Sequence, residues 1–327
     1  MLKKILLSAF FLGLLALAAT GLFWNSNKDE KPLCGNSVCD ERETELLCPE
    51  DCNDTAVNPE KEETVIETNI SAALPREITV GSNPVAFVSI HLEPGSNANT
   101  ADYPEQYWND LIDLIALADE YEVHLTLSMN PQWSIYILAD ETRLTQVRGW
   151  EAEGHELAYH GHGPHRDTWN GYTNQSEFQS DKNFLGTIAE MMDLMEQVPS
   201  SGHIFAACVS GPEDTDPDWP TNVSVRTDGG LEPSELLSTP VQETHNGQEV
   251  WYVTNRQYAI NKSSATLAEV AEGISAWQSG EVLGIVFHEK NYAEHPDEVE
   301  ALFKLFQDQN VQVEGVSSLV YSIVGQF

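Results

Sequence analysis

The sequence predicts an α/β fold in which parallel strands alternate with helices, and a closed or nearly closed barrel suits the number of units. Three observations carry this prediction. Short apolar runs typical of buried strands recur over about 250 residues from position 77 onward. Most of these runs are followed by apolar residues at the three- and four-residue spacing of a helix. Hydrophobic residues make up 41% of the 327 residues, which is ample for a buried core.

The expected elements follow one another in regular alternation. Strands are predicted at Val85–Ile90, His124–Met129, His155–His160, His203–Val209, Val250–Thr254, Val282–Phe287 and Val311–Val313. Helices are predicted from Trp108 to Ala118, from Pro131 towards Trp150, from Phe184 to Met195, from Leu267 to Trp277 and from Val299 to Phe306. The sequence contains neither a glycine-rich phosphate loop nor a GxSxG elbow, so nucleotide binding and serine hydrolysis have no support.

The net charge excludes one class of partner. There are 52 Asp and Glu residues against 16 Lys and Arg residues, which gives a formal charge of -36. A nucleic-acid binder needs clustered cations to neutralise phosphates, and this chain lacks them. Most of the acidic excess lies beyond position 63, in the part with strands and helices. We interpret it as a strongly hydrated surface, because net charge bears on solubility more than on site chemistry.

The N-terminus indicates export. A short basic start, Met1 to Lys4, precedes an apolar run over residues 5–24. This pattern is typical of a secretory signal peptide, with a small-residue cleavage site at Ala16 to Ala18, but the run is also long enough to span a bilayer as an uncleaved anchor. Residues 1–24 are therefore a signal peptide or a membrane anchor, and the rest of the chain is expected outside the cytoplasm, in an extracellular, periplasmic or membrane-anchored location.

Four of the five cysteines lie close together after the apolar run. Cys34, Cys39, Cys48 and Cys52 predict a small module at residues 25–55 with two disulfides, because an exported chain meets oxidising conditions; zinc binding is the alternative. The strings CGNSVCDERET and CPEDC resemble the short CGNGxCDxGET module of secreted and surface proteins. Residues 56–76 are acidic and turn-rich and are interpreted as a linker to the domain at residues 77–327.

Histidines mark the ends of three predicted strands. His91, His160 and His288 each stand where a strand leads towards a helix, the edge at which α/β folds carry their chemistry. Glu93 lies beside the first of them. Imidazole and carboxylate groups are the usual ligands of hydrolytic zinc, so a site for Zn²⁺ or another divalent transition metal is expected here. Our first choice of ligands is Glu93, His160 and His165, with His162 as a spare.

Three segments then resemble one family. Residues 154–166 read GHELAYHGHGPHR, which is similar to the GHEIxxHGxxHR segment of the polysaccharide deacetylases, the NodB-homology proteins of carbohydrate esterase family four. Residues 89–93, SIHLE, resemble the SVDVE variant of that family's first motif, and residues 286–289, VFHE, fall where its late histidine motif stands. The resemblance implies a distorted (β/α) barrel of about seven parallel strands and metal-dependent removal of acetyl groups from polysaccharides or amino-sugar oligomers.

The resemblance also implies roles for individual residues. His160 and His165 correspond to the metal histidines, Glu93 to the acidic ligand, and His288 to the general acid. His91 occupies the slot of the catalytic-base aspartate. An imidazole there is able to accept a proton, or to bind the metal as a fourth ligand and close the site. One extra residue, Pro164, separates the metal histidines.

Substrate contacts and rival functions complete the expectations. Trp219 and Arg166 are candidates for sugar binding, Trp219 by stacking if its ring is exposed beside the site. The leading hypothesis is an exported deacetylase. The alternative is a non-catalytic, surface glycan-binding protein on a deacetylase scaffold, and a third hypothesis is hydrolysis of a cyclic or linear amide. The oligomeric state is not predicted.

Overall fold

One sheet organises the part of the chain that the computed structural model describes, namely residues 75–94, 102–227, 235–258 and 263–326. The expected signal or anchor segment, the cysteine module with its four cysteines and nearly all of the linker lie outside these residues. The sheet has eleven strands. They are β1 Val85–Leu92, β2 Thr126–Met129, β3 Glu156–His162, β4 Ala206–Ser210, β5 Val225–Thr227, β6 Leu237–Ser238, β7 Val241–His245, β8 Gln248–Val253, β9 Arg256–Gln257, β10 Val282–His288 and β11 Gln312–Val313.

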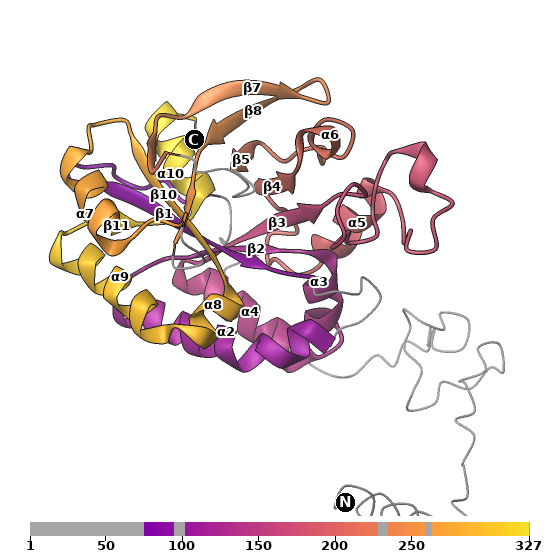
Figure 1. The fold of residues 1–327 in the computed structure, drawn as a ribbon, viewed down its shortest axis with the longest axis horizontal. Coiled ribbons are helices and arrows are strands. Elements are labelled where there is room, and N and C mark those ends of the chain that lie inside the picture. The colour runs from indigo at the N-terminus through magenta and orange to yellow at the C-terminus, as the bar shows by residue number, and fades with distance from the viewer. Residues whose placement is uncertain (1–74, 95–101, 228–234, 259–262, 327) are drawn as a thin grey trace, which may run out of the picture. The chain divides into compact units, whose positions relative to one another are not determined.

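The sheet curls into a half-barrel with a parallel centre. Its strand order is β6-β10-β1-β2-β3-β4-β5-β8-β7, and every neighbouring pair from β10 to β8 is parallel. The two outermost pairs, β6 with β10 and β7 with β8, are antiparallel. Figure 1 shows the curved sheet, with β1, β2 and β3 running through it and the β7–β8 hairpin at one edge. The predicted α/β barrel with about seven parallel strands is thus confirmed as a half-barrel.

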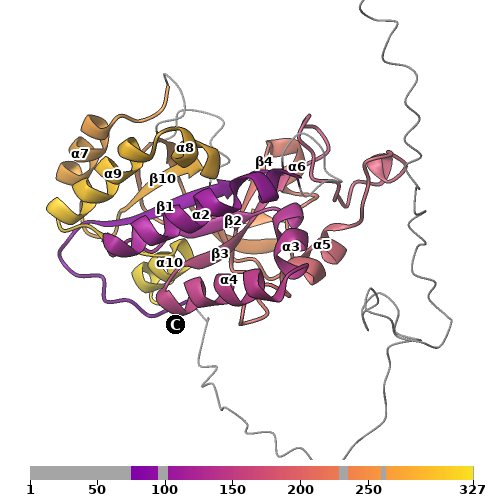
Figure 2. The same ribbon diagram turned by 90° about the horizontal axis from the view of Figure 1, so that it is seen from below.

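Helices cover mainly one face of the sheet. Figures 1 and 2 show α2, α4, α8 and α9 together on that face. The described helices are α2 Asp102–Glu120, α3 Pro131–Leu138, α4 Glu141–Glu153, α5 Ile188–Met195, α6 Pro212–Thr215, α7 Leu267–Ala276, α8 Glu289–Glu294, α9 Pro296–Asp308 and α10 Val316–Val324. None of the helices in the described part of the chain combines the length and the apolar composition needed to cross a membrane.

The helical stretch expected from Pro131 to Trp150 is divided in two. Asp140 breaks it, because its carboxylate accepts hydrogen bonds from the backbone N–H groups of Thr142 and Arg143 at 2.8 and 3.2 Å and so caps α4. Asn130 caps α3 in the same way through the N–H of Gln132 at 3.1 Å. The stretch is therefore helical as predicted, but the capping residue inside it ends α3 and begins α4.

Successive side chains in a strand face opposite sides of the sheet, and each side has its own core. In β1, Ala86, Val88, Ile90 and Leu92 belong to the core under the helices. Val85 and Phe87 face the other way and form a second core with the apolar residues of α10. Side chains in a strand alternate between the two faces, so Ser89 and His91 share the inner face with Phe87. The inner face thus carries α10 at one end of the strands and polar side chains towards the other.

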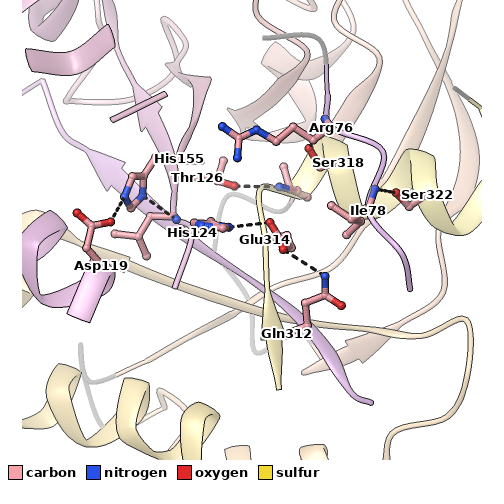
Figure 3. A network of polar contacts seen from close by, with 12 residues as sticks. Arg76, Ile78, Asp119, His124, Thr126, His155, Gln312, Glu314, Ser318 and Ser322 are labelled. Carbon is pink, nitrogen blue, oxygen red and sulfur yellow. Dashed lines mark hydrogen bonds and ion pairs between the residues drawn. The ribbon is translucent and has the colours of Figure 1, made fainter. Parts of the chain in front are cut away.

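α10 and the first described residues are fastened together at the amino ends of the strands. The N–H of Val316 donates to Thr126 Oγ1 at the start of β2 at 3.0 Å. The N–H groups of Arg76 and Ile78 donate to two serines of α10, Ser318 and Ser322, at 2.9 and 3.1 Å. Figure 3 shows these contacts beside a row of polar side chains. The end of the half-barrel opposite His91, His160 and His288 is therefore held by hydrogen bonds as well as by apolar packing.

Gly284 in β10 permits a close crossing of chain segments. The chain leaves β8 at Val253 and reaches β9, which pairs with β10. A Cβ at Gly284 would lie 2.2 Å from the carbonyl oxygen of Thr254 and 2.9 Å from Cα of Asn255. Both are backbone atoms, which cannot give way as a flexible side chain does. Only glycine lets the segment after β8 pass this closely over β10.

Candidate functional site

The histidines at the strand ends meet on the inner face of the sheet. His91 and His288 are direct neighbours in the parallel pairing of β1 with β10. His160 and His162 occupy alternate positions of β3, so both share one face with Ala158, which belongs to the core around α10. The predicted gathering of strand-end histidines is therefore found in the structure. Glu93, just beyond β1, reaches the same group.

Glu93 lies at the centre of the group. Its Oε1 atom is 2.9 Å from His288 Nε2 and 3.7 Å from His160 Nε2, and its Oε2 atom is 3.4 Å from His162 Nε2. Burial alone would raise the pKa of Glu93, but hydrogen bonds with His160 and His288 outweigh burial and hold the pKa of this carboxyl well below its usual value. Glu93 is therefore a carboxylate at neutral pH.

The nitrogen atoms of His160 and His162 are arranged as a pair of ligands. The two Nε2 atoms are 2.9 Å apart, and on the other side of its ring His162 Nδ1 is 2.5 Å from Thr168 Oγ1. Burial, aided by the neighbouring His160, lowers the pKa of His162 to about 3, so its ring is neutral. If Nδ1 donates its proton to the threonine oxygen, the lone pair on Nε2 is directed at the shared space.

Glu93, His160 and His162 fit a divalent metal. One ligand atom from each lies within 4.8 Å of the other two. Around a tetrahedral ion with bonds of about 2.0–2.1 Å, the ligand atoms would be roughly 3.4 Å apart. The observed separations of 2.9, 3.4 and 3.7 Å lie on both sides of that value. Two imidazoles and one carboxylate are also the ligand set that leaves a coordination position open in zinc hydrolases.

His91 is packed against this group without a hydrogen bond at Nε2. Its ring stacks on His160 with centroids 3.9 Å apart, and it meets His288 edge to face at 5.6 Å. The Nε2 atom is buried and has no hydrogen-bond partner. Burial, together with the nearby His160 and His288, keeps the pKa of His91 well below its ordinary value. The ring is thus a neutral imidazole, and it also lies within ligand distance of Cys208 and His160.

Asn291 fixes the orientation of His288. The amide oxygen Oδ1 of Asn291 accepts from the backbone N–H of His288 at 2.9 Å and lies 3.0 Å from its Nδ1 atom. An amide oxygen only accepts, so Nδ1 carries a proton, and Nε2 is the atom that faces Glu93. Asn291 was not recognised in the sequence. The signal was its place at the third position of α8, the position at which a side chain reaches back to the residue that caps the helix.

Glu289 is a second residue that the sequence did not single out. Its side chain is fully buried directly after His288, and both carboxyl oxygens lack a hydrogen-bond partner. Burial raises the pKa of Glu289 to about 7. The Tyr103 hydroxyl of α2 faces it, and burial followed by the charge of Glu289 raises the pKa of that tyrosine. An acidic side chain in an apolar region is thus placed behind the histidine.

Three of the expected site residues lie elsewhere. His165 is not brought to Glu93: its Nδ1 atom is 2.8 Å from Asp214 Oδ1 and its side chain is 38% exposed. His162, the spare ligand, lies beside Glu93 in the position expected for His165. Trp219 is 1% exposed, and its indole N–H donates to Val223 O at 3.2 Å, so its ring has no free face for a sugar. Arg166 is half-buried in the loop after β3.

Solved structures share this fold. A probable polysaccharide deacetylase from Pseudomonas aeruginosa superposes with a TM-score of 0.50 and 12% identity over 75% of this chain and 92% of that one. A PuuE allantoinase gives 0.49 and 13% over 78% and 99%, and a family 4 acetyl xylan esterase from Clostridium thermocellum with a cobalt ion gives 0.41 and 14% over 74% and 92%. The sequence matches no family model and no curated protein. The chain thus has the fold of the polysaccharide deacetylases.

Proposed function

We propose that the chain is an exported, metal-dependent hydrolase that removes acetyl groups from acetylated polysaccharides or amino sugars. The observation that carries the proposal is the grouping of Glu93, His160 and His162 with two further imidazoles, His91 and His288, at the carboxyl ends of parallel strands. The fold shared with a probable polysaccharide deacetylase supports the substrate class. Export is inferred from residues 1–24.

The proposed reaction needs metal ligands, a base and an acid. Glu93, His160 and His162 would hold Zn²⁺ or another divalent transition metal, with His162 in the position first assigned to His165. Such an ion supplies a Lewis acid for the acetyl carbonyl and lowers the pKa of water. His91, neutral and with a free Nε2 atom, accepts the proton of the attacking water. His288 donates a proton from Nε2 to the departing amine or alcohol, while Asn291 keeps Nδ1 protonated.

The test is acetate release by the full chain loaded with zinc. Chitin oligomers, peptidoglycan and acetylated xylan serve as substrates. We expect acetate from at least one of them, and loss of that activity together with loss of zinc in His162→Ala. His203→Gln is the matched control, because His203 pairs with Glu196 just before β4, at the opposite end of the strands, and it should retain the activity and the zinc. A folded, zinc-loaded protein that releases no acetate from any of the three would overturn the proposal.

One observation favours the non-catalytic alternative. Burial holds the pKa of His91 far below its usual value, which makes this imidazole a weak base. If His91 is too weak a base to activate water, the protein binds acetylated glycans without converting them. Retention on an immobilised glycan, with unchanged product mass after long incubation, would then be the result. Acetate release excludes this alternative, and cleavage of a cyclic or linear amide in place of an acetyl group identifies the third hypothesis.

A further inference from the structure

A second group of possible metal ligands lies beyond the central cluster. It consists of His165, Glu213 and Asp214, each of which offers one ligand atom, and these atoms all lie within 4.8 Å of one another. His165 follows β3, whereas Glu213 and Asp214 belong to α6, which follows β4. β3 and β4 are parallel neighbours in the sheet. The group is therefore assembled from the exits of two adjacent strands.

Asp214 is the buried member of this group. Its side chain is fully buried. The Oδ1 atom lies 2.8 Å from His165 Nδ1 and accepts from Gln175 Nε2 at 3.1 Å, but Oδ2 is buried without a hydrogen-bond partner. Within the described residues, its ion pairing is with His165 and with no lysine or arginine. A buried carboxylate oxygen without a donor is costly, and a bound cation removes that cost.

The surroundings of Asp214 are negative. Asp218 is buried one helical turn further on, and Gln175 Nε2 is shared between the two carboxylates at 3.1 and 3.2 Å. Burial, with a contribution from Asp214, raises the pKa of Asp218. Glu213 and Glu177 lie close enough to His165 to act on its charge. Among the described residues, Asp214 pairs with the imidazole of His165, and the neighbouring carboxylates add further negative charge around this pair.

Gly163 brings the loop after β3 directly onto Asp214. A Cβ at this glycine would lie 2.1 Å from Asp214 Cγ, so the backbone itself touches the carboxylate. The N–H of Arg166 donates to Gly163 O at 3.1 Å, which closes a tight turn. This turn holds His165 over the carboxylate. The arrangement is accordingly fixed by backbone contacts as well as by the flexible side chains.

We propose that His165, Glu213 and Asp214 bind a divalent transition-metal ion, zinc in the first instance, at a site separate from Glu93, His160 and His162. One imidazole nitrogen and two carboxylate oxygens suit such an ion, and the exposure of His165 leaves room for water to complete its coordination. The ion links the loop after β3 to α6. The proposal does not depend on acetyl hydrolysis and stands even if the chain releases no acetate.

The test counts zinc in the full-length chain. Protein freed of metal by a chelator is titrated with Zn²⁺, and bound zinc is measured by mass spectrometry of the metal after removal of excess. We expect Asp214→Asn to bind one zinc fewer than the parent chain, and His160→Ala to lose a different one, so that the double variant loses two. Any zinc held by the cysteine segment is common to all variants and cancels.

The matched control is Glu177→Gln, which removes a nearby charge but no proposed ligand, and it should bind as much zinc as the parent chain. Equal zinc in Asp214→Asn and the parent overturns the proposal, as does the loss of both ions in His160→Ala alone. Should Asp214→Asn not fold, the exposed His165→Gln decides the question. Loss of one zinc in that variant supports the second site, and retention of the parent's full number overturns it.

Discussion

The rings of His91 and His160 stack with centroids 3.9 Å apart and an angle of 24° between their planes, although β1 and β3 are separated by β2 in the sheet. Neighbouring strands lie about 4.8 Å apart, so in a flat sheet these two strands would be roughly 10 Å apart. The stack is possible because the sheet curls towards its inner face, which tilts the side chains together. The curvature of the half-barrel therefore assembles the candidate site.

Replacement of His91 separates its two possible roles. If His91 is the base, His91→Gln should lower kcat by about 10²–10⁴-fold, while zinc content stays at the parent level. Steady-state kinetics on the acetylated substrate and metal analysis of the same preparation check this. If His91→Gln instead lowers the affinity for zinc as much as replacing His160 or His162 does, His91 is a fourth ligand.

Asn291 should act on catalysis through His288. Asn291→Leu removes the oxygen that holds Nδ1 of His288 and fixes its proton. We expect kcat to fall about 10–100-fold, the usual effect of losing a partner that orients a site histidine, with a smaller change in KM. Asn291→Asp keeps an accepting oxygen and should restore most of the activity. Equal losses in both variants would contradict a role in positioning the ring.

Glu156 should make stability depend on pH. It is half-buried at the start of β3, with its Oε1 atom buried and without a hydrogen-bond partner, and burial raises its pKa to about 7. Because the unfolded carboxyl has an ordinary pKa near 4.5, the folded state holds its proton more tightly. The protonated Glu156 therefore adds to the free energy of unfolding. This stabilisation is fully present below the unfolded pKa and is lost as the pH rises through the folded pKa of about 7, and it amounts to at most about 3 kcal/mol.

Glu156→Gln removes this proton equilibrium while its amide oxygen still accepts from the N–H of Ser317, which is 2.9 Å from the present carboxylate. Between pH 5 and 8 the variant should therefore gain stability relative to the parent chain in urea unfolding. The exposed Glu153→Gln in α4 is the control and should keep the parent's pH dependence. A parallel pH dependence of the parent and Glu156→Gln would show that Glu156 titrates normally.

Two glycine substitutions should have opposite effects on stability. Gly284→Ala places a Cβ 2.2 Å from a backbone oxygen in the crossing after β8, and we expect a loss of about 1–3 kcal/mol in the free energy of unfolding. Gly149→Ala, in α4, meets no atom within 4 Å and should gain about 0.5–1 kcal/mol, because alanine favours the helix. Denaturant unfolding measures both, and a neutral Gly284→Ala would refute the close crossing.

The sequence predicted those parts of the site that local periodicity controls. β1 and β10 are mostly apolar runs, and His91 and His288, near the carboxyl ends of these strands, fall side by side because the strands are parallel and in register. The same reasoning placed His160 at the end of a strand. These positions depend only on the two-residue repeat of a strand and on the common edge of a parallel sheet.

The choice between His162 and His165 depended on contacts that are distant in sequence. The ring of His165 is held by Asp214, a buried residue that follows the next strand, and no local pattern announces that contact. Trp219 was a candidate for stacking on a sugar if its ring were exposed beside the site, but it packs into the core. Neither β5 nor the helix α10 was predicted. β5 has three residues, too few for an alternating pattern to show, whereas α10 does carry apolar residues at helical spacing and was overlooked.

The helix α10 has a consequence for the order in which the chain folds. Val85 and Phe87 of β1 lie near the beginning of the described chain, whereas the apolar residues that cover them, Val316, Leu319 and Val320, lie near its end. β10, which pairs with the same strand, also comes late. During synthesis β1 can pair early with β2, but it lacks its neighbour on the other side and its cover until almost the whole chain has appeared. Such long-range pairing slows folding and exposes apolar surface meanwhile, so a truncation before α10 should leave the inner core open.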